Sequence, residues 1–158
     1  MRVSSSMGAT LLACLLAAPA FAQPSSIRAD QPWARATAPQ QQVGSAYVTL
    51  TSPAADRLIG ASSPAAARVT VHAMQMDGTT MQMRQPLDGL PLPAGQSLKL
   101  SPGGYHLMLD GLTAPLVVGQ AIAVQLRFAK SPPLDLTFQV APAGAREPGL
   151  PGAHGQQH

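Results

Sequence analysis

The feature that most constrains the fold is a set of short apolar runs with a period of two, each closed by Pro, Gly, Asp or Ser. In residues 124–128, for example, Val, Leu and Phe alternate with Gln and Arg. Such alternation places the apolar side chains on one face of a strand. The 16 prolines would interrupt most helices, and no segment has a convincing helical period. The pattern therefore predicts an all-β domain, either an antiparallel sandwich or a barrel.

The same pattern sets the expected domain limits. Residues 23–30 lack it, and we expect a flexible lead-in there. Residues 142–158 are rich in Pro, Gly, Gln and Ala and predict a disordered tail, so the folded domain should span residues 31–141. The candidate strands are residues 33–36, 46–51, 56–61, 68–76, 81–84, 97–100, 106–109, 121–128 and 134–140.

Residues 1–22 have the organisation of a secretory signal peptide. Arg2 precedes an apolar stretch that ends in a small-x-small site at residues 20–22, which predicts cleavage after Ala22 and a mature chain of 158 − 22 = 136 residues. The stretch is too short to span a bilayer, so we expect an exported protein without membrane insertion. A lipoprotein cleavage site ending at Cys14 is the alternative. The chain stays apolar after Cys14, where lipoproteins turn polar, and this favours simple cleavage.

The mature chain carries no cysteine, because Cys14 lies in the leader. A disulfide, a thiolate nucleophile and a thiolate metal ligand are therefore excluded. Charged residues are scattered singly, with nine Lys and Arg against seven Asp and Glu once Arg2 is removed. This distribution does not favour nucleic-acid binding. We found no motif for hydrolysis, and we expect a binding protein, not an enzyme.

Methionine and histidine gather in one window of the mature chain. All its methionines lie between positions 74 and 108, and His72 and His106 are its only histidines outside the tail. A single methionine could be a flexible core residue, and a single histidine could be an ordinary surface residue. This explanation is less convincing for the whole set. The methionines are Met74, Met76, Met81, Met83 and Met108.

The spacing within this window predicts shared faces. His72, Met74 and Met76 lie two residues apart and share one face of a strand, as Met81 and Met83 do on the next. The hairpin signal at residues 77–80 allows two registers. If the loop is residues 78–79, Met74 lies opposite Met83. If the loop is residues 77–78, His72 lies opposite Met83. In both registers His72 and Met83 are direct or diagonal cross-strand neighbours, with Cβ atoms ~5 to 8 Å apart. His106 and Met108 share a face of a third strand, whose position relative to the first two is not determined by the sequence.

Two imidazoles and two thioethers form a ligand set that favours copper(I). Thioethers select this soft ion over zinc, magnesium or calcium. Outside the cytoplasm a methionine also has the advantage that it cannot form a disulfide. An electron-transfer cupredoxin would need a cysteine thiolate, which this chain lacks. We expect the affinity to fall when the histidines protonate, near pH ~6 to 7.

At these residues the chain resembles the periplasmic copper chaperones of the PCuAC type, whose signature is H-x10-M-x21-H-x-M. Ten residues separate His72 from Met83, and His106 and Met108 complete the motif. There are 22 residues between Met83 and His106, one more than the signature, and we place the extra residue in the loop at 85–89. The segments at 33–37, 46–48 and 56–58 also look like the family.

The resemblance implies a single-domain, cupredoxin-like, antiparallel Greek-key β-sandwich that binds one copper(I) through His72, Met83, His106 and Met108. It also implies a periplasmic role in delivering copper to the dinuclear copper centre of cytochrome c oxidase. The accepting partner would be subunit II of the oxidase or a Sco-type thiol protein. Copper storage or detoxification is the alternative function, and a metal-free scaffold domain is a third.

Two features lie outside this motif. Met74, Met76 and Met81 either pack against the domain or form a soft sulfur surround or relay. His154 and His158 lie in the tail, where a weak second copper(II) site would cost chain entropy, and we expect a solvated tail instead.

Overall fold

The computed structural model describes residues 26–148, which form strands, turns and loops without an α-helix. Within these residues no helix is long and apolar enough to cross a membrane. The strands are β1 (Arg28–Arg35), β2 (Val43–Thr51), β3 (Asp56–Ser62), β4 (Ala66–Asp77), β5 (Thr80–Arg84), β6 (Leu90–Leu92), β7 (Ser97–Lys99), β8 (His106–Leu112), β9 (Ala121–Phe128) and β10 (Leu134–Ala141).

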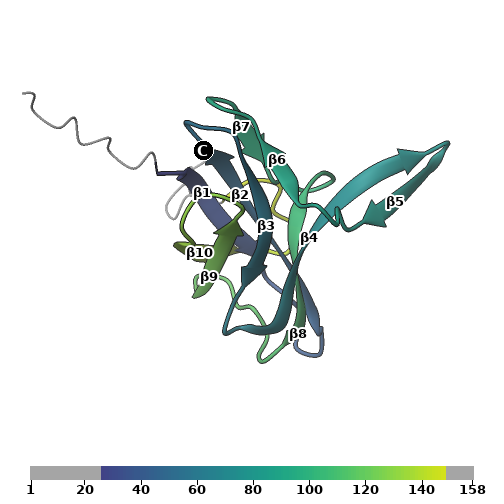
Figure 1. Cartoon of the computed structure of the whole chain (residues 1–158). Helices are drawn as coiled ribbons and strands as arrows, with labels where there is room; N and C mark the ends of the chain where they lie inside the picture. The colour runs from purple at the N-terminus through teal and green to yellow at the C-terminus, as the bar shows by residue number, and fades with distance from the viewer. Residues whose placement is uncertain (1–25, 149–158) are drawn as a thin grey trace, which may run out of the picture.

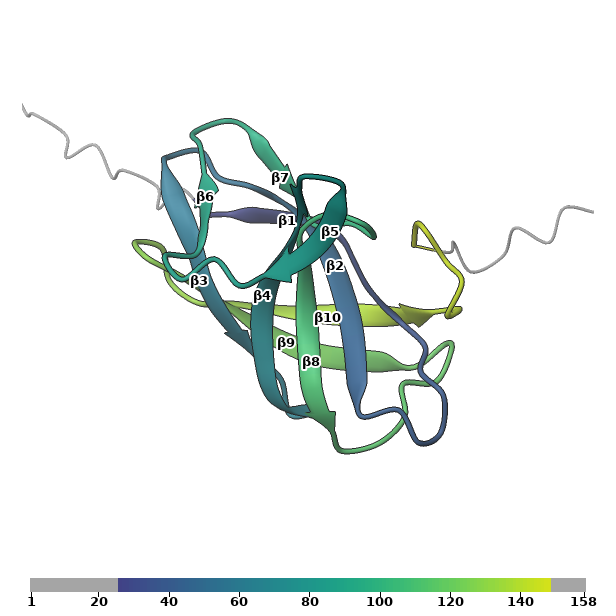
Figure 2. The same ribbon diagram turned by 90° about the vertical axis from the view of Figure 1, so that its right-hand side faces the viewer.

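The strands form a sheet that curls back on itself. Its order is β5-β4-β8-β2-β1-β10-β9-β3-β6, with β7 beside β2. The pair Ala61↔Val69 joins β3 to β4 and closes the central strands into a flattened barrel. Figure 2 shows β4, β8 and β2 side by side, with β9 and β10 crossing behind them. The expected all-β sandwich is confirmed, and the two layers enclose one core.

One pairing departs from the expected antiparallel pattern. Strands β1 and β10 run parallel, with Trp33 opposite Gln139 and Arg35 opposite Ala141. A hairpin can join only antiparallel neighbours, and these two strands lie at opposite ends of the domain sequence. No local turn therefore sets their direction, which follows from the closure of the sandwich.

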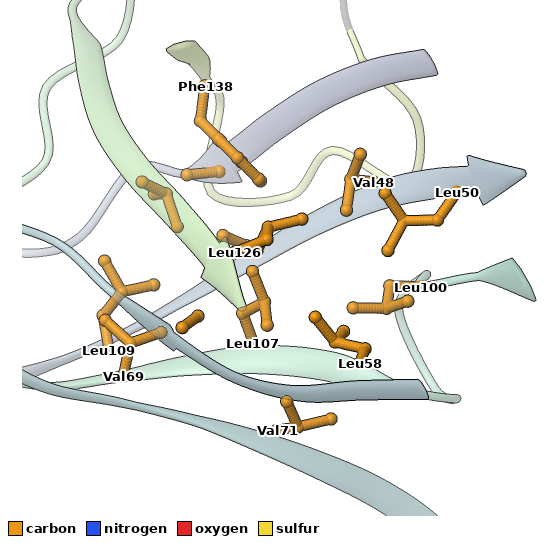
Figure 3. Packing of buried hydrophobic residues seen from close by; sticks show 14 of the residues in the cluster. Val48, Leu50, Leu58, Val69, Val71, Leu100, Leu107, Leu109, Leu126 and Phe138 are labelled. Carbon is orange, nitrogen blue, oxygen red and sulfur yellow. The ribbon is translucent and has the colours of Figure 1, made fainter. Parts of the chain in front are cut away.

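The core is built from the apolar side of each alternating strand. On β8, Leu107 and Leu109 are fully buried, and between them Met108 lies on the opposite face. Leu126 and Phe138 contribute from β9 and β10, as the sequence pattern indicated. Figure 3 shows these side chains packed between the layers. Complete burial of each Leu or Phe contributes ~1.5–3 kcal/mol, so the core is large enough to hold the outer faces of the strands in fixed positions.

The N-terminal boundary and one strand differ from the sequence prediction. Strand β1 begins at Arg28, inside the segment 23–30 predicted as a lead-in, and Ile27 is buried in the core. The residues before Trp33 are polar, so the start of the strand lacks an alternating apolar pattern. The pairing with β2 also shifts register between Asp30 and Trp33, and Gln31 in this interval has a φ of 51°. Strand β6 was missed because Pro91 breaks the pattern. Proline is tolerated there because β6 lies at the edge of the sheet.

The C-terminal boundary also differs. Residues 142–148 were predicted to belong to a disordered tail, but they return to the domain through a turn in which Ala145 N–H donates to the Pro142 carbonyl. The Arg35 guanidinium donates to the carbonyl of Ala145 at 2.8 and 3.0 Å. The predictions for residues 1–25, including the leader, and for 149–158, including His154 and His158, lie outside the described residues.

Candidate metal site

The two candidate histidines lie face to face on neighbouring strands. Strand β4 pairs with β8 so that His72 is directly opposite His106. Their ring centroids are 5.8 Å apart, with the ring planes tilted by 36°. The register follows from the core, because Val71 and Leu107 are buried on the inner face and force both histidines outward. The third strand, which the sequence could not place, thus lies beside the first.

One ring nitrogen of His106 is committed to a hydrogen bond. Its Nδ1 lies 3.0 Å from the carbonyl oxygen of Gly104, and the ring is only 7% exposed. A carbonyl oxygen only accepts, so Nδ1 carries the proton and Nε2 of the neutral ring keeps a free lone pair. Metal-binding histidines commonly donate their second nitrogen in this way.

The turn before β8 makes this hydrogen bond possible. Gly103 has a φ of 83°, a left-handed conformation that glycine adopts without strain, and Gly104 N–H closes the turn on the Ser101 carbonyl. The turn leaves the Gly104 carbonyl free to accept from the imidazole. The turn at Gly103 and Gly104 therefore also sets the orientation of His106.

His72 presents a buried nitrogen that has no hydrogen-bond partner within residues 26–148. Its Nδ1 is buried, as is the similarly unpaired Oγ1 of Thr70 on the same strand face. A buried polar atom without a partner costs about 1–3 kcal/mol. Burial lowers the pKa of His72, and the nearby His106 lowers it further, against a smaller opposing effect of Asp110. The neutral ring that a metal ion requires is therefore favoured.

The β4–β5 hairpin brings two methionines close to the histidines. Met74 lies opposite Met83, which is the first of the two registers that the sequence allowed. His72 is therefore a diagonal neighbour of Met83, not its direct partner. Met83 is 47% exposed, whereas Met74 and Met108 are half-buried.

A shallow pocket of about 290 Å³ collects most of the candidate ligands. His106, Met108 and Met83 line it, and so do Met74 and Tyr47. His72 does not line the pocket and reaches it only through its contact with the His106 ring. The structure thus places three of the four candidate ligands around one opening, with the fourth, His72, beside His106 on the neighbouring strand.

An aromatic cluster forms the wall beside this pocket. Tyr47 packs on Trp33 with ring centroids 4.5 Å apart, and the Arg35 guanidinium carbon lies 5.6 Å from the centre of the Tyr47 ring. The Tyr47 hydroxyl donates to Ser45 Oγ at 2.9 Å. Trp33 is buried in this separate cluster and not in the main core. Sequence reasoning missed Tyr47, although its alternation with buried Ala46 and Val48 marks it as outward-facing.

The available donors limit the kind of metal that the site can hold. Within residues 26–148, His, Cys, Asp and Glu side chains do not gather in threes that could bind an ion. The candidate site offers two imidazoles, and the thioethers of Met74, Met83 and Met108 line the pocket beside His106. Carboxylate-preferring ions such as magnesium and calcium are disfavoured, and a soft monovalent ion is favoured.

Comparison with known proteins relates the chain to a lipoprotein family. The family model described as "Putative lipoprotein LpqE-like" matches residues 27–140. The protein "Putative lipoprotein Lxx21020" of Leifsonia xyli subsp. xyli is 35% identical over 124 residues, which cover 75% of this chain and 75% of that protein.

Solved structures share the fold. The apo PCuAC domain from PmoF1 is 20% identical, with a TM-score of 0.62 over 76% of this chain and 97% of that domain. The copper-bound PCuAC domain from PmoF2 is 25% identical, with a TM-score of 0.59 over 72% and 91%. The solution structure of CuI-DR1885 from Deinococcus radiodurans is 29% identical, with a TM-score of 0.58 over 78% and 82%. The expected cupredoxin-like fold is confirmed, and two of these three domains carry copper.

Proposed function

Because this chain belongs to the LpqE-like family and has the fold of PCuAC domains, we propose that it is an exported copper(I) metallochaperone. It binds one copper(I) ion per chain through His72, Met83, His106 and Met108. The observation that carries the proposal is the opposed histidine pair. Within residues 26–148, Nδ1 of His106 is held by the Gly104 carbonyl, which leaves Nε2 as the available donor atom, and Nδ1 of His72 is buried without a partner. The hydrogen bond to Gly104 orients the His106 ring before any ion arrives.

The ligands differ in how firmly the fold holds them. His106 is buried and fixed by Gly104, whereas Met83 is 47% exposed on the β4–β5 hairpin. A copper ion held in this way is anchored on the histidine side and open on the methionine side. A partner can therefore approach from the open side and replace one thioether at a time. Such stepwise exchange suits delivery better than long-term storage.

Ligand strength favours a thiol-bearing acceptor. Cysteine thiolates bind copper(I) as anions, while the ligands proposed here are all neutral. Transfer to a thiol-bearing acceptor therefore runs towards the stronger ligand. We propose cytochrome c oxidase subunit II, or a Sco-type thiol protein serving its dinuclear copper centre, as the acceptor, and the periplasm as the place of transfer.

A competitive titration tests copper binding. Reduced mature protein is mixed with copper(I) and a chromophoric chelator, and the fraction of ion lost from the chelator is measured. We expect one equivalent to be withdrawn, with strong weakening in His106→Ala and Met83→Ala. His154→Ala serves as the control and should leave the affinity unchanged. If wild-type protein fails to compete with a modest chelator, the proposal is wrong.

A second experiment separates delivery from detoxification, which the ligand set alone does not distinguish. Loss of a delivery protein should lower cytochrome oxidase activity when copper is scarce. Loss of a detoxifying protein should instead lower survival when copper is abundant. Normal oxidase activity in low copper would favour the storage or detoxification alternative.

A further inference from the structure

The β4–β5 hairpin extends beyond the body of the domain. Figure 1 shows it as an arm pointing away from the other strands. Strand β5 pairs only with β4 within the described residues, and the hairpin turns at Gly78, which has a φ of 62°. Its register places Met76 opposite Met81 near the tip and Met74 opposite Met83 closer to the domain.

The hairpin has two chemically different faces. The alternation of the strands puts the side chains of the four methionines on one face. The other face carries polar residues, including Arg84 and Asp77, whose charged groups are 3.8 Å apart. The hairpin therefore presents a row of thioethers on one side and a hydrated surface on the other.

Packing does not account for the methionines at the tip. Met76 is 62% exposed and Met81 is 53% exposed, and neither belongs to a core cluster. Burial of a methionine contributes ~1.5–3 kcal/mol, and these two forgo much of that gain. Polar residues would serve an exposed hairpin tip better. Of the two sequence-based explanations, packing is therefore excluded for Met76 and Met81.

The thioether row leads directly to the histidine pair. Met76, Met74 and His72 follow one another along the same face of β4, each two residues apart. Two residues of strand correspond to ~7 Å. Met81 and Met83 accompany them on β5, and His106 lies opposite His72 at the inner end. Opposed side chains have Cβ atoms ~5 Å apart, so the flexible sulfur arms of one pair can hold a single ion between them.

We propose that Met76 and Met81 form a second, weaker copper(I) site, through which the ion passes between the histidine pair and a partner protein. The inference rests on the proposed function and extends it to the route of transfer. In each step an incoming thioether displaces one ligand of copper(I), which is an imidazole or a thioether at the histidine site and a thioether on the hairpin. The charge of the ion does not change, and no proton or electron moves. Two neutral sulfurs bind less firmly than a site with two imidazoles, so the ion rests at the histidines and visits the tip.

Nuclear magnetic resonance with labelled methionine methyl groups tests the site, with silver(I) as a redox-inert substitute for copper(I). We expect the first equivalent to shift the methyl signals of Met83 and Met108. The second equivalent should shift those of Met76 and Met81. If the first equivalent binds but the tip signals do not move with the second, this inference is wrong while the proposed function stands. If no methionine signal moves at all, both fail.

Transfer kinetics test the route. Met76→Leu/Met81→Leu removes both sulfurs at nearly constant volume and at exposed positions, so folding should be unaffected. We expect an unchanged affinity for the first copper(I), with transfer to a thiol acceptor slowed by about tenfold, or ~1.4 kcal/mol in activation free energy. The matched control Val117→Leu/Val118→Leu alters two similarly exposed apolar residues away from the hairpin and should transfer at the wild-type rate. Equal rates in the two double variants would overturn the relay.

Discussion

Replacing His72 by leucine should make the copper-free protein more stable while it weakens copper binding. Nδ1 of His72 is buried without a hydrogen-bond partner in the described chain, and such an atom costs about 1–3 kcal/mol. Leucine has a similar size and no polar atom. The free energy of unfolding should therefore rise by ~1–2 kcal/mol, after some allowance for altered packing. For a mature chain of this length, that corresponds to a rise in Tm of ~3–10 °C.

The same substitution should flatten the dependence of stability on pH. Burial lowers the pKa of His72 in the folded protein below the usual histidine value of 6.5, so the unfolded chain binds more protons between the two values. Protonation of His72 therefore does not reduce the free energy of unfolding above pH 6.5, and the pH-dependent contribution of this residue is fully present there. It is lost as the pH falls towards the folded pKa. In His72→Leu this loss should disappear.

Thermal unfolding of the copper-free proteins, followed by circular dichroism at pH 7 and at lower pH, measures both effects. Thr70→Val is the matched control, because it removes a second side-chain atom on β4 that is buried and unpaired within the described part of the chain, without changing a proposed ligand. It should also stabilise the fold, yet keep the wild-type copper(I) affinity. The reasoning would be refuted if His72→Leu were less stable than the wild type while Thr70→Val behaved as expected. In that case the imidazole already has a favourable role in the empty site.

Three further predictions concern binding, folding and processing. Chelator competition across pH should show that the copper(I) affinity falls as the medium becomes acidic. Protonation of His72 should contribute only below pH 6.5, because its pKa is lowered. An affinity that is constant down to pH 4 would contradict this. Asp56→Ala should lower the free energy of unfolding by ~2–4 kcal/mol in denaturant titrations. Burial raises the pKa of the Asp56 carboxyl, but hydrogen bonds from the Ser131 hydroxyl and from the backbone N–H groups of Arg57, Lys130 and Ser131 outweigh it and hold the pKa below 3.8; a change under ~1 kcal/mol would show that these bonds are dispensable. Intact mass of the exported protein should match cleavage after Ala22, whereas a lipid-modified chain beginning at Cys14 would overturn that prediction.

Much of the fold could be predicted because the local alternation of apolar and polar residues indicates a strand. The pattern in residues 124–128 and 134–140 identified β9 and β10, and the turn signal after Asp77 gave the hairpin with one of its two allowed registers. The errors lie where local signals conflict with tertiary contacts. Pro91 obscured β6, and polar residues obscured the start of β1. The segment 142–148 was assigned to the tail because its ordering depends on Arg35, which is distant in the sequence.

The sequence by itself determined which donors the mature chain offers: imidazole and thioether without thiolate, spaced so that they share strand faces. Only the tertiary structure decided that β8 lies beside β4 with His106 opposite His72, and that the tip methionines are exposed. It also decided that one histidine nitrogen is buried without a partner among residues 26–148. The physical reason is that side-chain alternation is a property of a few consecutive residues. The pairing of distant strands is instead set by how all the apolar faces close around one core.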